Sequence, residues 1–207
     1  MKFALAALGG SMVDPVKTIA VNGDYYVNAK LGLGFMKPSD WTFDIYKDFG
    51  TLLEGQIIEG IEPDDEEDFR RDETSTLVAA IAKYDHSIPK FSPSITVFKN
   101  QDNRKVLDSL DLDQFILDAQ DGFATLLKEY EVIEQQTRCE FSKCEARRFK
   151  SRWLFQHKRM HPTLIDDETL VIDQGTYLYS IHLYDSPYTG NIASKEFRQF
   201  VESLHIA

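Results

Sequence analysis

The sequence predicts an α+β fold built on a mainly antiparallel sheet. Segments with the period-two apolar pattern of strands occupy both halves of the chain, and one long segment between them has the 3.6-residue pattern of a helix. Strand and helix patterns do not alternate regularly, as they would in a parallel α/β fold. The composition is that of an ordinary globular protein, with 43% hydrophobic and 28% charged residues. No apolar run reaches the ~20 residues of a membrane-spanning helix.

The first part of the chain is expected to hold short strands and one short helix. The dipeptide Asn22-Gly23 readily adopts positive φ, which predicts a tight turn between two strands. The alternation of Trp41, Phe43 and Ile45 indicates a half-buried strand. The other expected elements are strands at Lys17–Val21, Tyr25–Asn28 and Leu31–Met36 and a helix at Lys47–Gln56.

The middle of the chain carries the clearest helix pattern. Two apolar strands, Leu77–Tyr84 and Ile95–Lys99, are expected before it. Asp111 or Ser109 is expected to cap the helix, because both side chains can accept a hydrogen bond from a backbone N–H of the first turn. Its apolar stripe, which indicates packing on a core, consists of Leu112, Phe115, Ile116, Ala119, Phe123, Leu126, Leu127 and Tyr130.

Long antiparallel strands and a closing helix are expected at the end of the chain. Glu145–Lys158 has a period of two, and Asp173-Gln174-Gly175 predicts a turn between Leu170–Ile172 and Thr176–Tyr184. The last of these strands is apolar at nearly every position, so we expect it at the centre of the sheet. The closing helix is indicated by Phe197, Phe200, Val201 and Leu204, with Ser194 as the expected cap.

Negative charge is concentrated in one segment. The chain has a formal net charge of −11, and nine acids against two arginines fall in residues 59–73. Such a segment is either a solvated loop or a docking segment for a basic protein partner. The candidate contact residues are Asp64, Asp65, Glu66, Glu67 and Asp68. Nucleic acid is not an expected partner, because phosphate binding needs a positive field.

A basic stripe is expected on one side of the Glu145–Lys158 strand. Arg148, Lys150 and Arg152 share that side, while Phe149, Trp153 and Phe155 point to the other. Because the aromatic side chains are assigned to the buried face, they cannot stack on bases. The stripe, which continues in Lys158 and Arg159, either balances acidic neighbours or meets an acidic partner, and we treat it as a second candidate contact surface.

No pattern in the sequence names a reaction. There is no Gly-x-Ser-x-Gly elbow, and Gly32 and Gly34 lack the further residues of a phosphate-binding loop, so no cofactor is expected. His182 lies on a strand face, where a histidine that is exposed or has a structural partner is a simpler interpretation than a catalytic base.

Two other groups of side chains are candidates for a metal site and for a disulfide. His157 and His161, followed by Asp166, have a spacing that permits a metal site, although Lys158 and Arg159 between them would repel a cation. Cys139 and Cys144 bracket a possible hairpin loop and are either two free thiols or a disulfide.

The expected organisation is a single domain at 17–207 after an N-terminal extension at 1–16. Phe3–Leu8 is apolar and follows one lysine, which is signal-like, whereas Gly9-Gly10-Ser11 is typical of a remnant of cloning. The charged region and the cleavage site of an export signal are poorly developed, which favours a cytoplasmic protein, with export to the periplasm as the alternative.

Five patches of this sequence resemble the PsbP-like superfamily, also called Mog-like, which includes bacterial DcrB-like domains. The patches are Leu33–Trp41, Ala82–Asp85, Phe91–Ile95, Gly175–Leu183 and Phe197–Ile206. The resemblance implies an antiparallel sheet flanked by helices on both faces. It also implies non-enzymatic roles, since members are assembly factors of a photosynthetic complex, a binder of a small nuclear-transport GTPase, and chaperones for secreted bacterial effectors. The patches carry the fold rather than a catalytic signature.

Three functions remain open at this point. The first is a non-enzymatic protein-binding module, a chaperone or assembly adaptor. The second is an immunity or inhibitor protein against a basic toxin, which the acidic balance would suit because charge steering speeds association. The third is a small metal-dependent hydrolase that uses His157, His161 and Asp166.

Overall fold

The large sheet contains most of the strands in the computed structural model, which describes residues 10–11, 19–21, 23–43, 72–84, 91–100 and 111–207. Its order is β1-β6-β7-β11-β10-β9-β8, with β5 paired to β6. The strands are β1 (Gly10–Ser11), β5 (Thr42–Phe43), β6 (Asp72–Ala82), β7 (Ser94–Asn100), β8 (Glu131–Phe141), β9 (Cys144–His157), β10 (Met160–Asp173) and β11 (Leu178–Asp185). Among the described strands of this sheet, only β1 and β6 pair in parallel, so the predicted antiparallel α+β class is confirmed.

The apolar strand β11 lies between β7 and β10, at the centre of the sheet as its composition predicts. It begins at Leu178 rather than Thr176, because Gln174 and Tyr177 close the preceding turn with a backbone hydrogen bond of 3.1 Å. Gly175 has a φ of 93° in that turn, a backbone conformation that favours glycine.

A second, four-stranded sheet joins three strands from the first part of the chain to the strand β12. Its order is β12-β4-β3-β2, from β2 (Ile19–Val21), β3 (Tyr25–Asn28), β4 (Leu33–Met36) and β12 (His205–Ile206). The strand predicted from Leu31 begins two residues later, since the Leu31 N–H donates to Asn28 O in a turn. The Tyr179 hydroxyl of β11 donates to Leu31 O at 2.5 Å and so links the two sheets.

Helix α5 (Leu112–Leu126) begins as predicted, with the Asp111 side chain accepting from the Gln114 N–H. It ends earlier than the stripe suggests, and Glu129 then adopts a φ of 56°. The Arg147 and Arg138 guanidinium groups donate to the Asp113 carboxylate, which holds the pKa of that carboxyl down at about 2. These bonds fasten the first turn of the helix to β8 and β9.

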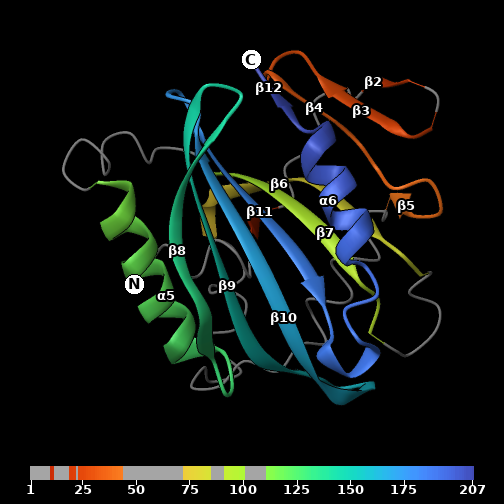
Figure 1. Cartoon of the computed structure of the whole chain (residues 1–207), viewed down its shortest axis with the longest axis vertical. Helices are drawn as coiled ribbons and strands as arrows, with labels where there is room; N and C mark the ends of the chain where they lie inside the picture. The colour runs from red at the N-terminus through yellow and green to blue at the C-terminus, as the bar shows by residue number, and fades with distance from the viewer. Residues whose placement is uncertain (1–9, 12–18, 22, 44–71, 85–90, 101–110) are drawn as a thin grey trace.

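Helix α6 (Ser194–Ser203) begins one residue earlier than predicted, since a helix capped by Ser194 would begin at Lys195. Ala193 is the N-cap residue and makes no side-chain cap bond, so the prediction of Ser194 as cap is wrong. The Ser194 hydroxyl instead donates to Asn191 O at 2.7 Å. Figure 1 shows α6 beside the small sheet and α5 beside β8.

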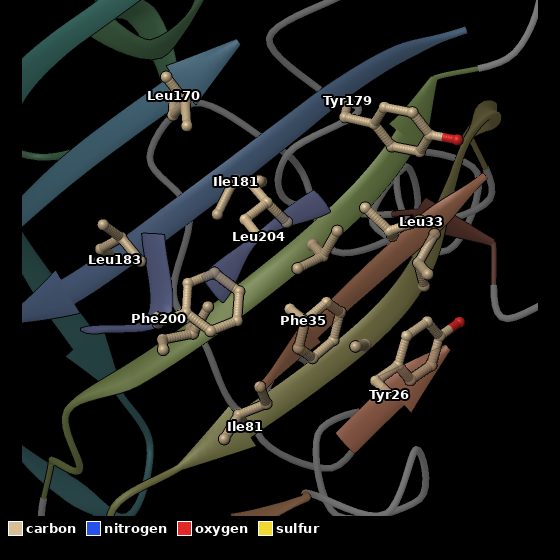
Figure 2. Packing of buried hydrophobic residues seen from close by; sticks show 14 of the residues in the cluster. Tyr26, Leu33, Phe35, Ile81, Leu170, Tyr179, Ile181, Leu183, Phe200 and Leu204 are labelled. Atoms are coloured by element: carbon tan, nitrogen blue, oxygen red, sulfur yellow. The ribbon is translucent and has the colours of Figure 1, made fainter. Parts of the chain in front are cut away.

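Each helix packs against a different set of strand residues. Helix α5 shares a buried cluster with Phe149, Val171 and Leu178, whereas α6 shares one with Ile181 and Leu183. Leu178 and Ile181 occupy positions of opposite parity on β11, and successive side chains of a strand point to opposite sides. In the second cluster Phe35 and Phe200 lie with ring centroids 5.1 Å apart (Figure 2). The predicted helix Lys47–Gln56 and most of the acidic segment 59–73 lie outside the described residues.

Candidate functional site

The predicted basic stripe lies on one side of β9. Phe149, Trp153 and Phe155 are buried, and Arg148 and the other stripe residues between them are at least partly exposed, so the predicted alternation is confirmed. The sequence folds this way because aromatic and basic residues alternate with the period of a strand.

The stripe is paired with acids of the adjacent strand β10. The Arg148 guanidinium lies 2.7 Å from Glu168 Oε1, and Lys150 Nζ lies 3.9 Å from Asp166 Oδ2. Arg152 Nε and Nη2 donate to the two oxygens of Asp166 at 2.6 and 3.2 Å. This bidentate contact raises the pKa of Arg152. Asp166 is only 3% exposed, and such a buried carboxylate needs an opposite charge.

A charged cleft of about 290 Å³ lies between this stripe and α6. Leu183, Phe197 and Val201 contribute apolar surface to it. Arg148, Lys150, Asp166 and Glu168 line it on the strand side, and Arg198 and Glu202 line it on the helix side. The cleft therefore offers apolar contact next to groups of both charges, a combination that suits a polypeptide segment.

Asp185 positions the helical wall of the cleft. Its Oδ1 accepts hydrogen bonds from the Ser186 N–H at 2.8 Å and the Thr189 hydroxyl at 3.3 Å, and its Oδ2 accepts one from the Ala193 N–H at 2.8 Å. One buried carboxylate thus ties the end of β11 to the start of α6. Nothing in the local sequence pattern around Ser194 indicated this contact.

A buried polar cluster that the sequence patterns did not predict lies on the opposite side of the sheet. His182 Nδ1 lies 3.0 Å from Asp167 Oδ2, and the Thr169 hydroxyl lies 3.3 Å from both Asp167 Oδ1 and His182 Nδ1. His182 is 2% exposed and stacks on Tyr184 with ring centroids 5.6 Å apart. Burial is the main reason why the pKa of the Tyr184 phenol is raised. The available signal was the polar pair Asp167 and Thr169 in an apolar strand.

This cluster lacks the geometry of a nucleophilic triad. Asp167 and Thr169 both face the Nδ1 side of His182, whereas a nucleophile would have to face Nε2. Within the described part of the chain, His182 Nε2 is buried and has no hydrogen-bond partner. Of the two alternatives for His182, the geometry agrees with a histidine that has a structural partner, and the burial of the ring contradicts an exposed one.

The candidate metal ligands do not gather. No group of three or more histidine, cysteine, aspartate or glutamate side chains among the described residues could hold a metal ion. His157 Nδ1 accepts the Arg159 N–H at 3.0 Å, and Asp166 is bound by Arg152. His161 lies near the hairpin turn, five residues of extended strand from Asp166.

Two remaining predictions concern the acidic segment and the cysteines. Asp64, Asp65, Glu66, Glu67 and Asp68 lie outside the described residues. Cys139 and Cys144 are free thiols, the first of the two alternatives. In the β8–β9 hairpin Cys139 is opposite Ala146, and Cys144 is opposite Phe141, so the two thiols do not face each other.

Comparisons with known proteins rest on structure alone. No protein-family model and no curated protein sequence matches this chain. The solved structure of cyanobacterial PsbP (CyanoP) from Synechocystis sp. PCC 6803 aligns with a TM-score of 0.52 at 12% identity, over 94% of this chain and 99% of that one. The fold is PsbP-like. LpqN of Mycobacterium tuberculosis, described as involved in cell envelope biogenesis, aligns with a TM-score of 0.48 at 10% identity, over 92% of this chain and 90% of that one.

The PsbP-like fold supports the family resemblance of the sequence at the level of architecture. At sequence identities of 10 and 12%, the functional residues of those proteins cannot be assigned to positions of this chain. Among the described helices, none is long and apolar enough to span a bilayer.

Proposed function

We propose that this PsbP-like chain is a non-enzymatic protein-binding module, a chaperone or assembly adaptor, in which helices cover both faces of the sheet in the PsbP/Mog-like manner. The packing of α5 on Phe149 and Leu178 and of α6 on Ile181 and Leu183 supports that arrangement. The protein partner binds in the charged cleft.

The charged cleft is the observation that carries the proposal. It combines the apolar side chains Leu183 and Phe197 with exposed cations such as Arg148 and Arg198. Interfaces with proteins have this anatomy, an apolar centre inside a polar rim. Its internal ion pairs restrain the side chains that a partner would meet, which lowers the entropy lost on binding.

Affinity capture of the tagged chain from its host tests the proposal. The variant Arg148→Ala/Lys150→Ala removes two cleft cations, and Lys143→Ala/Lys195→Ala removes two exposed lysines that do not line the cleft. Arg152 is left in place because it neutralises buried Asp166.

We expect one stoichiometric partner to be captured by the native chain and the control variant and lost from the cleft variant. A partner that both variants retain equally would refute the cleft as its binding site. The salt concentration of the wash distinguishes two modes of binding. Loss of the partner at high salt indicates that charged groups hold it, and its retention indicates contact with the apolar side chains.

An inhibitor of a basic toxin is the second candidate, and the net charge of −11 favours it. In that case the acidic segment, rather than the cleft, holds the partner. Replacing Asp64, Asp65, Glu66, Glu67 and Asp68 with their amides would then release a basic partner that the cleft variant still captures.

A further inference from the structure

The β9–β10 hairpin extends beyond its neighbours as a two-stranded arm. The pairing of β8 with β9 starts at Arg152, and the pairing of β11 with β10 starts at Asp166. Between these points, residues 153–165 pair only with each other among the described strands, from Trp153↔Ile165 to His157↔Met160. Figure 1 shows the end of this hairpin at the lower edge of the molecule, opposite the small sheet.

The arm is anchored at its base. Trp153, Phe155 and Ile165 are buried in one cluster with Phe123 and Leu127 near the end of α5. A two-stranded ribbon alone is only marginally stable in water, so this apolar base is what holds the arm in place. The backbone N–H of Arg159 also donates to His157 Nδ1 at 3.0 Å, which fixes the turn. The tip is therefore presented in one orientation and need not be ordered on binding.

The tip of the arm is cationic in an acidic protein. Residues 153–165 contain Lys158 and Arg159 and no aspartate or glutamate, although the whole chain has a net charge of −11. Both cations are exposed. Arg148, Lys150 and Arg152 on the same hairpin each have an acidic partner. Lys158 and Arg159 form no ion pair with the described residues.

The arm is not built to add a further strand from a partner. Its register shifts between Met160 and Thr163. Pro162, which lies at that shift, has no N–H to donate. Bulges and prolines are the features by which exposed strand edges avoid backbone pairing. Recognition at the tip must therefore come from side-chain charge.

We propose that the arm tip, through Lys158 and Arg159, is a docking surface for an acidic segment of a partner protein. Two cations match two or three carboxylates, and arginine can engage a carboxylate through two hydrogen bonds. A nucleic acid or an anionic bilayer extends past the tip and meets the field of a chain with a net charge of −11, which repels it. A short acidic segment contacts the tip alone.

The test uses the full chain and a fluorescein-labelled deca-glutamate peptide as the probe, with fluorescence anisotropy as the readout. The variant Lys158→Glu/Arg159→Glu reverses the charge of the arm tip. The control Lys143→Glu/Lys195→Glu changes the net charge by the same amount at two exposed sites elsewhere. Circular dichroism of both variants verifies the fold.

We expect the native chain to bind the peptide at low salt and the tip variant to bind at least about tenfold more weakly, while the control changes by less than about threefold. Equal weakening in both variants would show that only the overall field matters and would overturn the proposal. Absence of binding by the native chain, or stronger binding to a DNA duplex or to phosphatidylglycerol vesicles than to the peptide, would overturn it too. Binding in the charged cleft is tested independently of the arm tip, because the cleft variant Arg148→Ala/Lys150→Ala leaves Lys158 and Arg159 unchanged.

Discussion

Replacing Asp185 with asparagine should destabilise the protein by removing the contact that holds the start of α6. The Asp185 carboxylate is 3% exposed and accepts from the Ser186 and Ala193 backbone N–H groups, each at 2.8 Å. An asparagine of the same shape keeps one acceptor oxygen and turns an NH2 group toward the other N–H. A hydrogen bond to a charged group contributes about 1.5–3 kcal/mol, and a buried donor left unpaired costs about 1–3 kcal/mol. The free energy of unfolding should therefore fall by about 3 kcal/mol.

Urea denaturation followed by tryptophan fluorescence measures this loss. With a denaturant dependence of about 2–3 kcal/mol per molar urea, the unfolding midpoint should fall by about 1 M. Asp24→Asn is the matched control, because that carboxylate is 44% exposed and holds a single ion pair with Lys37. The control should lose less than about 1 kcal/mol. If Asp185→Asn also loses less than about 1 kcal/mol, the reasoning that one carboxylate fixes the helix start is refuted.

Three further predictions concern other parts of the molecule. Burial and the charge of Arg159 lower the pKa of His157 below its ordinary value of 6.5, so the stability that its neutral form contributes is complete above about pH 6.5 and is lost as the pH falls through the lower pKa of the folded state. Denaturation at pH 7.5 and 5 should therefore show a larger loss in the native chain than in His157→Gln. Burial raises the pKa of the Cys139 and Cys144 thiols, so reaction with a disulfide reagent at pH 7.5 should be slower than for a free cysteine peptide, and mild oxidation should not link the two. Phe200→Ala should cost about 3–5 kcal/mol of unfolding free energy, because it empties a fully buried aromatic position; a loss below about 1 kcal/mol would contradict the packing.

Local patterns in the sequence predicted the elements whose signals are themselves local. The alternation of Phe149 and Trp153 with the stripe fixes the two sides of β9, because a strand has a period of two. The Asp111 cap of α5 depends only on a side chain and the N–H three residues later. Both predictions were correct.

The pairing of the stripe could not be derived from the sequence, because it depends on the register of β9 against β10. Asp166 and Asp167 are adjacent in the chain and point to opposite sides of the sheet. The first neutralises Arg152, and the second contacts His182. Neither role is visible until the hairpin turn fixes which residues face each other.

The wrong cap at α6 has a similar cause. Ser194 has the right chemistry for a cap, but the Phe197 N–H that it would accept donates to Ala193 O at 2.8 Å. Asp185, eight residues before Ala193, holds that residue in place by accepting its N–H. The Asn191 carbonyl then takes the Ser194 hydroxyl as a donor. Tertiary hydrogen bonds of this kind override local capping preference.

The pairing of β12 with β4 constrains how the protein is made. Ile206 pairs with Leu33, so the edge of the small sheet is formed by residues more than 170 positions apart. During synthesis β4 leaves the ribosome long before its partner, since chains elongate at about 5–20 residues per second. Nascent chains must therefore carry an unfinished β4 edge for seconds, a stage at which a chaperone has the best opportunity to bind.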